Sequence, residues 1–368
     1  MSDMFSAVYF FPNKVDQIIK DVRVFFSRCK LQKEWESMQK AVVKLQKCLL
    51  QYMGHRLRAK VQFSAIKELK NSLKTNMDTI MVVMDHKQKI LQMKYREGQV
   101  EYYGKSGMSM LGTMIISWTD DDKQAGFNFH FWDFILKGYT SQDNTQVAAV
   151  VQLIVKRVKE CLPNVNKIIF QSDNATCFAS QELIPYIYHL NIQSKEKKLP
   201  TISKWIFTEA QTGRGRLDTH FAYVNCIIKS YVQDGNNIVL EEHILKALSF
   251  NGGLAGTSAI LVNCSDLEGP CVTKKFRSKK VKSRATHEIE WFEDKVHITE
   301  NSGITQPEVV LRTKLEKHEL LNLKVTTEEV FDSDKPALFV GKQKFIPDNL
   351  IGHEEIITSK AITIAQAL

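Results

Sequence analysis

The sequence lacks paired cysteines and long apolar runs. Its seven cysteines are scattered, and the smallest spacing, from Cys264 to Cys271, is wider than the two to four residues between paired ligands of a structural zinc site. No apolar stretch approaches the ~20 residues that span a bilayer. The first residues, MSDMFSAVYFFPNKVDQ, lack the basic start and long apolar core of a secretory signal. We therefore expect no zinc finger, membrane segment or secretory signal, and the odd number of cysteines suits a reducing compartment.

Acidic residues are outnumbered, 41 against 50 basic residues, which gives a net charge of +9 and a pI near 9.0. A basic balance favours polyanionic partners, because each phosphate that is neutralised releases a counterion. The charge is concentrated at Lys274–Arg284 (KKFRSKKVKSR), where seven of eleven residues are basic. This run predicts a nucleic-acid-binding patch or a nuclear-import signal, with a solvated linker as the alternative. Its candidate phosphate-binding residues are Lys274, Lys275, Arg277, Lys279 and Lys280.

Glycine and proline are nearly absent from residues 1–75, with Pro12 and Gly54 as the exceptions. Apolar residues recur at helical spacing in VDQIIKDVRVFF, WESMQKAVVKLQKCLLQYM and FSAIKELKNSL, while lysine and arginine occupy the other positions. We predict a helical, basic N-terminal region over 1–75. Such a region either covers DNA or packs on the domain that follows, and the pattern slightly favours packing.

The pattern changes to strands and then to alternating strands and helices over residues 76–265. TIMVVMDHKQ and KIIFQSDN are β-branched apolar runs that each end in a carboxylate, as buried strands do, and further strands are predicted in GQVEYYGK, MSMLGTMIISW, FNFHFWDFIL and KWIFTEA. Helices are predicted in TQVAAVVQLIVKRVKECL, capped by Ser141 or Asp143, in SQELIPYIYHL, and in LDTHFAYVNCIIKSYVQDG, closed by Gly235. This order predicts an α/β domain with a mixed sheet flanked by helices.

The chain from 266 to 368 is expected to form a basic linker and a small β-rich C-terminal domain. HEIEWFEDKVHITE and ALFVGKQKFIP have the alternation of hairpin strands. The segment EEHILKALSFNGGLAGTSAILV before it reads as a short helix, a Gly-Gly turn and a strand.

Three aspartates stand where such a domain presents reactive groups. Asp85 follows the first apolar strand, Asp173 follows the strand KIIFQS, and Asp218 opens the helix after TGRGRL. Open sheets bind ligands outside the carboxyl ends of their strands, so the first two carboxylates are expected to converge. In-line attack on a phosphodiester uses two divalent ions held by oxygen ligands. The three carboxylates therefore predict a site for two Mg²⁺ or Mn²⁺ ions, against the alternative that each is a turn residue or helix cap.

The local sequence resembles DDE/D-type transposases and retroviral-type integrases. SDNATCF at 172–178 resembles their second catalytic strand, and EAQTGRGRLDTHFAYVNCIIKS resembles their third segment, in which an acid opens a helix after a glycine-containing turn. EYYGKSGMSMLG and NGGLAG resemble blocks of transposon-derived proteins. The resemblance covers roughly residues 75–265. It implies a ribonuclease H-like fold, a catalytic and metal-binding triad of Asp85, Asp173 and Asp218, and DNA as substrate.

The same resemblance implies contacts to nucleic acid along the third segment. Asn225 and Lys229 lie seven and eleven residues after Asp218, on one helical stripe. In the turn before the helix, Arg214 and Arg216 are candidates for bidentate contacts to phosphate, with an exposed basic loop as the alternative.

The pattern departs from the family at the third acid, which is Asp218 where Glu is commoner. Glu209, at the end of KWIFTEA, is a competing third ligand. Lys87 stands two residues after Asp85, where the proofreading-type exonucleases of this fold place Glu, so that branch is set aside. Asp133 is expected to be a buried, hydrogen-bonded carboxylate rather than a fourth ligand.

These observations favour a nuclear transposase-like enzyme that cleaves DNA and transfers strands. The main alternative is a domesticated transposase-derived protein that binds DNA or protein without cleaving. A ribonuclease or junction resolvase is a weaker alternative, so RNA remains a second candidate substrate. A homo-oligomer is a further expectation. The three acids argue for retained chemistry, and the lack of a zinc-binding recognition module argues against it.

Overall fold

A computed structural model describes residues 17, 20, 21, 24, 32–98, 103, 105–121, 124–208, 215–264, 266, 267, 271, 288–299, 307–317, 323 and 325–341. The chain divides into two compact units, Met1–Ser64 and Ala65–Leu368. The expected boundary between the first two regions lay at residue 75, eleven residues further along the chain.

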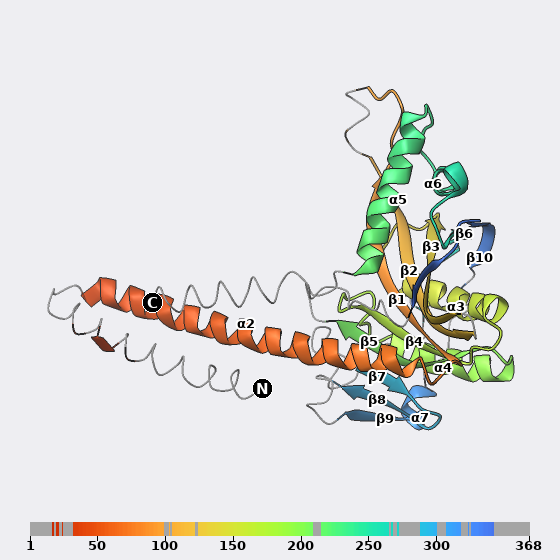
Figure 1. Cartoon of the computed structure of the whole chain (residues 1–368). Coiled ribbons are helices and arrows are strands. Elements are labelled where there is room, and N and C mark those ends of the chain that lie inside the picture. The colour runs from red at the N-terminus through yellow and green to blue at the C-terminus, as the bar shows by residue number, and fades with distance from the viewer. Residues whose placement is uncertain are drawn as a thin grey trace. The chain divides into compact units, whose positions relative to one another are not determined.

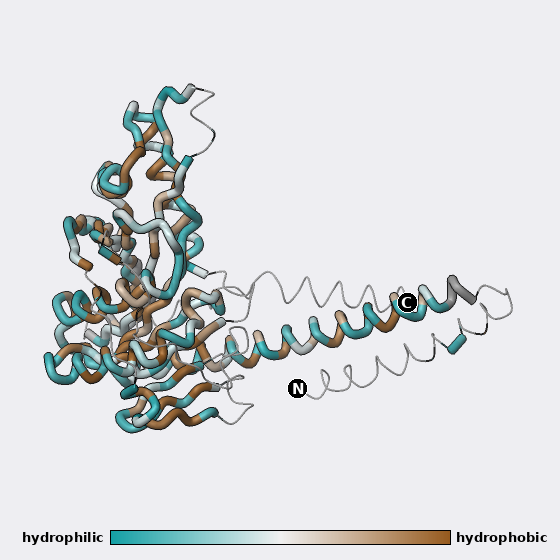
Figure 2. The backbone as a smooth tube through the Cα atoms, turned by 180° about the vertical axis from the view of Figure 1, so that it is seen from behind, coloured by the Kyte–Doolittle hydropathy of each residue, from teal (hydrophilic) through white to brown (hydrophobic). Residues whose placement is uncertain are grey.

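The described part of the N-terminal region is helical, as its composition predicts. The helix α2 (Gln32–Ser72) runs for 41 residues, and Gly54 is its only glycine. Brown and teal segments alternate along this helix in Figure 2, which reflects the recurrence of apolar residues at helical spacing. Several apolar side chains of α2 are exposed to solvent, namely Val43, Leu45, Leu50, Tyr52 and Leu57.

The second unit is built on a mixed β-sheet (Figure 1). Its centre has the strand order β3-β2-β1-β4-β5, with antiparallel pairing from β1 to β2 and from β2 to β3, and parallel pairing from β1 to β4 and from β4 to β5. The bounds are Thr79–Leu91 for β1, Gly107–Asp121 for β2, Gln124–Lys137 for β3, Lys167–Asp173 for β4 and Thr201–Thr208 for β5. These are the strands predicted from sequence, apart from GQVEYYGK. The described residues of that stretch, Gly98, Tyr103 and Lys105, are not in a strand.

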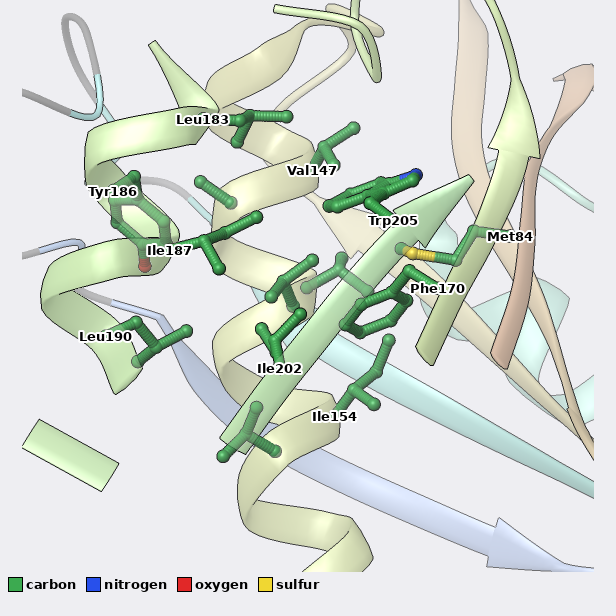
Figure 3. Close-up of a cluster of buried hydrophobic side chains, with 14 of the residues drawn as sticks. Met84, Val147, Ile154, Phe170, Leu183, Tyr186, Ile187, Leu190, Ile202 and Trp205 are labelled. Atoms are coloured by element: carbon green, nitrogen blue, oxygen red, sulfur yellow. The ribbon is translucent and has the colours of Figure 1, made fainter. Parts of the chain in front are cut away.

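Helices cover both faces of this sheet, as expected for a mixed sheet between helices. On one face, α3 (Asn144–Cys161) and α4 (Leu183–Glu196) enclose a core that includes Met84, Phe170 and Trp205 (Figure 3). On the other face, α5 (Arg216–Gln233) and α6 (Glu241–Ser249) pack against a second core. Successive residues of β1 alternate between the two cores, because side chains of a strand point alternately to opposite faces.

Helix ends follow from local chemistry. Asp143, one of the two candidate caps, precedes α3, and its carboxylate accepts a hydrogen bond from the amide of Gln146 at 3.0 Å. Pro185 lies in the first turn of α4, where the missing N–H would have no intrahelical partner anyway. Gly235 follows the end of α5 with a φ of +95°, a conformation that favours glycine.

The remaining strands extend the sheet at both sides. At the β5 side, β7 (Glu288–Trp291), β8 (Lys295–Thr299) and β9 (Glu308–Leu311) follow as an antiparallel series, and the short helix α7 (Arg312–Leu315) comes after β9. At the β3 side, β6 (Thr257–Asn263) runs parallel to β3, β10 (Thr326–Asp332) pairs with β6, and β11 (Leu338–Gly341) pairs with β3. The expected boundary at residue 265 therefore separates strands that share one sheet.

Residues of the C-terminal region pack closely against the NGGLAG segment, residues 251–256. A Cβ atom at Gly253 would lie 2.6 Å from the ring of Phe331, and one at Gly256 would lie 2.6 Å from the Cα of Ala337. Both glycines have positive φ, 71° and 63°. The ammonium of Lys335 donates to the carbonyl of Gly253 at 2.6 Å. Glycine is needed at these two positions because another chain segment approaches the backbone closely.

Candidate functional site: a carboxylate cluster beneath helix α5

Asp85 and Asp173 occupy equivalent positions on neighbouring parallel strands. The last registered pair between β1 and β4 is Val83 with Gln171, and each aspartate lies two residues further along its strand. Because side chains two residues apart share a face and neighbouring strands lie about 4.8 Å apart, the two carboxylates leave the same face at the same level. The structure thus brings together the two strand-end acids that the sequence predicted to converge.

The same level continues across the sheet in the other direction. Asp85 pairs with Gly112 on β2, and Gly112 pairs with Asp133 on β3. Helix α5 packs closely over this row, since a Cβ atom at Gly112 would lie only 2.3 Å from the ring of Phe221. The absence of a side chain at Gly112 therefore lets α5 approach the acidic positions.

Asp218, the third predicted acid, is at the start of α5. One oxygen of its carboxylate accepts a hydrogen bond from the amide of Gly215 at 2.8 Å. Asp218 therefore helps to cap the helix, as the alternative predicts. It does so from the third position of the helix, and the N-cap itself is Gly215. Its negative charge also acts on Asp85, so capping and membership of the cluster are compatible.

The electrostatics of Asp85 show that the other two acids lie near enough to act on it. Burial, then the negative charge of Asp173, then that of Asp218, raise the pKa of Asp85 from 3.8 to about 7, and a hydrogen bond from the backbone of His86 opposes this. Burial also raises the pKa of Asp173, whose carboxylate accepts a hydrogen bond from the amide of Ala175 at 3.1 Å. A pKa of about 7 leaves Asp85 partly protonated near neutral pH, as expected for a buried carboxyl group beside like charges.

The cluster suits a divalent cation in donor chemistry and charge. Carboxylate oxygens are the ligands that Mg²⁺ and Mn²⁺ prefer, and a cation would relieve the repulsion that raises the pKa of Asp85. Among the described residues, however, no three His, Cys, Asp or Glu side chains are close enough together to hold one metal ion between them. A metal ion held by all three carboxylates would therefore require them to move closer, as like charges do once a cation screens them.

Asp133 is a buried structural carboxylate, as the sequence predicted. It is fully buried, and its Oδ2 lies 2.8 Å from Nε2 of His220 on α5. The ring of His220 is also buried and stacks on Phe131 with centroids 4.3 Å apart. This pair fastens α5 to β3 on the interior side of the helix.

The structure describes three of the candidate nucleic-acid-binding residues, all on α5. The guanidinium of Arg216 lies over the ring of Phe129 at 4.6 Å, at the beginning of α5. Asn225 and Lys229 are exposed on α5, and the side-chain oxygen of Asn225 accepts a hydrogen bond from Lys87 at 2.5 Å. The other candidates fall outside the described residues, namely Glu209, Arg214, Lys274, Lys275, Arg277, Lys279 and Lys280.

Two site residues escaped the sequence interpretation. The sequence predicts a strand around Gly112 but no role for the glycine itself. It marks Lys87 only as a departure from the proofreading-type exonucleases, which place Glu there. The period-two rule already placed Lys87 on the same face as Asp85. Nothing local in the sequence pairs Gly112 with Phe221, which is more than 100 residues away.

Comparison of the chain with protein-family models, with curated proteins and with solved structures finds no match. Within the described part of the chain, no helix is long and apolar enough to cross a membrane. The carboxylate cluster and the residues around it therefore carry the functional argument alone.

Proposed function

We propose that this chain is a transposase-like enzyme that cleaves DNA phosphodiesters and transfers strands, with Asp85, Asp173 and Asp218 as its catalytic and metal-binding residues. The observation that carries the proposal is electrostatic. Burial raises the pKa of Asp85, and the negative charges of Asp173 and Asp218 raise it further, to about 7. Perturbed carboxylates gathered at the carboxyl ends of parallel strands are typical of functional sites.

The topology supports the same proposal. The order β3-β2-β1-β4-β5, with only β2 antiparallel to its neighbours, and the helices α3, α4 and α5 after β3, β4 and β5 resemble the ribonuclease H-like arrangement. In this arrangement, we propose, the acids of β1 and β4 and the acid of α5 form the reactive centre.

Each carboxylate would have its own task. Asp85 and Asp173, at one level of the sheet, would bridge one divalent ion, and Asp218, with one oxygen already fixed by the amide of Gly215, would hold the second. Bound Mg²⁺ or Mn²⁺ ions at such a site activate the attacking oxygen, from water or a DNA 3′-hydroxyl, and stabilise the leaving oxygen. The chain's own contribution is to hold the three acids near one another. The close packing of Phe221 on Gly112 keeps α5, which carries Asp218, against the sheet that carries the other two.

DNA is the proposed partner because the chain carries a net charge of +9 and has exposed basic and amide side chains on α5 beside the cluster. RNA is an alternative substrate. Nuclear localisation and a homo-oligomeric state belong to the same proposal.

Cleavage by an Asp173→Asn variant tests the proposal. The substitution keeps the shape of the side chain but removes the charge, so Mg²⁺- or Mn²⁺-dependent nicking of supercoiled plasmid is expected to fall by orders of magnitude. Binding of duplex DNA in EDTA is expected to hold or to rise, because a negative charge near the phosphates is gone. Asp234→Asn, which alters an exposed aspartate at the far end of α5, is the matched control and is expected to cleave normally.

Two outcomes would change the assignment. If the unaltered protein binds DNA yet shows no metal-dependent cleavage of duplex, hairpin or branched substrates, it is a domesticated DNA-binding protein. The observation that favours this second function is that no three His, Cys, Asp or Glu side chains of the described residues are grouped closely enough to hold one metal ion. If cleavage survives in Asp218→Asn but is lost in Glu209→Gln, Glu209 is the third ligand.

A further inference from the structure

Lys87 is a buried lysine next to the carboxylate cluster. It lies two residues after Asp85 on β1, and therefore on the same face, beneath α5. Only 5% of the residue is exposed, and its ammonium donates a hydrogen bond to Oδ1 of Asn225 at 2.5 Å. Burial lowers the pKa of Lys87, and the negative charge of Asp133 opposes this shift. A lysine is seldom buried without a specific partner, and here the partner is a single amide.

This contact fixes the orientation of the Asn225 side chain. An amine of lysine donates hydrogen bonds, so the atom of Asn225 that faces Lys87 is the carbonyl oxygen. The amide nitrogen and its two N–H donors therefore face away from Lys87. Asn225 is exposed and shares a helical stripe with Asp218, Ala222 and Lys229. The stripe thus carries an oriented, uncharged pair of donors and, about two helical turns earlier, one of the three carboxylates.

We propose that Lys87 is a positioning residue that holds Asn225 as a hydrogen-bond donor to a phosphate oxygen of the DNA strand at the cluster. The inference rests on the proposed function, since it takes the polyanion at the cluster to be DNA. Three carboxylates repel a phosphate backbone, and a fixed amide donor offsets part of that repulsion without neutralising the carboxylates. A free amide would also turn its N–H group toward a phosphate, but it would lose rotational freedom in doing so, and the tie to Lys87 removes that cost in advance.

Asn225→Asp separates this role from a structural one. The carboxylate keeps, and strengthens, the tie to Lys87 but has no donor to offer. Ala222→Asp is the matched control, because it adds the same charge to the same stripe and leaves the tie intact. Affinity for a fluorescein-labelled duplex, measured by anisotropy in EDTA, is expected to be about tenfold weaker in Asn225→Asp than in Ala222→Asp. The melting temperature of Asn225→Asp is expected to equal or exceed that of the unaltered protein.

A double-mutant cycle tests the positioning by Lys87 itself. Lys87→Met keeps a buried apolar stem but leaves Asn225 free to turn, so DNA binding is expected to weaken several-fold. The same substitution in an Asn225→Ala background is expected to weaken binding less, because only the charge of the lysine is lost and no amide remains to be oriented.

The outcomes distinguish the two proposals. If the unaltered protein binds DNA while Asn225→Asp and Ala222→Asp bind equally well, the inference is wrong and the proposed function stands. Equal effects of Lys87→Met in both backgrounds would overturn it as well. If the unaltered protein binds no DNA at low salt, the proposed function and the inference fall together.

Discussion

Replacing Asp85 with asparagine should make the folded protein more stable at pH 8. Burial and the charges of Asp173 and Asp218 raise the pKa of Asp85 from 3.8 to about 7. A raised pKa in the folded state means that the folded protein binds this proton more tightly than the unfolded chain does. The favourable contribution of the protonated group is therefore complete below pH 4 and is lost as the pH rises through 7. A shift of about three units corresponds to an upper bound of about 4 kcal/mol at pH 8.

Urea denaturation between pH 5 and pH 8 in EDTA measures this effect. The free energy of unfolding of Asp85→Asn, relative to the unaltered protein, should rise across this range by roughly 2–3 kcal/mol. Asp234→Asn, remote from the cluster, should show no such trend. A gain that does not depend on pH, or a loss of stability that grows with pH, would refute the reasoning, because it would mean that folding does not raise the pKa of Asp85.

Three further predictions follow from the same geometry. Asp173→Asn removes a charge that raises the pKa of Asp85, so carboxylate NMR titration should show that pKa below 7, and an unchanged value would place Asp173 outside electrostatic range. Gly112→Ala should cost about 1–3 kcal/mol in urea unfolding because its Cβ would overlap the ring of Phe221, and a second change, Phe221→Leu, should recover part of this; full stability of the single variant would contradict the close packing of α5. Mn²⁺ affinity measured by calorimetry should increase from pH 6 to pH 8 as Asp85 loses its proton, whereas a constant affinity would exclude Asp85 as a ligand.

The strands that carry the acids could be predicted because their signals are local. β1 and β4 are buried on both faces, so each has a continuous apolar run; an aspartate follows this run directly in β1 and after two polar residues in β4. The sequence offers Ser141 and Asp143 as the cap of α3. The cap is Asp143, because its carboxylate accepts a hydrogen bond from the amide of Gln146. Ser141 lies two residues before this cap.

Strand pairings and side-chain contacts between distant parts of the chain could not be predicted from the sequence. Nothing local indicates that β10 joins β6 or that β11 joins β3, so the C-terminal strands were expected to form a domain of their own. GQVEYYGK alternates like a strand, yet its described residues lie outside the ladder that β1 and β2 form. The tie between Lys87 and Asn225 joins residues 138 apart in sequence. The sequence predicts that Asp85 and Asp173 converge at the strand ends, but it could not give the position of Asp218 relative to them, which depends on how closely α5 packs on Gly112.

The central claim is that Asp85, Asp173 and Asp218 together bind divalent metal. A crystal of the full chain soaked in MnCl₂, with anomalous diffraction measured near the manganese edge, tests it most directly. We predict an anomalous peak bound by the carboxylates of Asp85 and Asp173, with Asp218 drawn toward it, and no such peak in Asp173→Asn crystals. Manganese bound elsewhere on the protein, with the cluster empty and the three carboxylates still apart, would contradict the account.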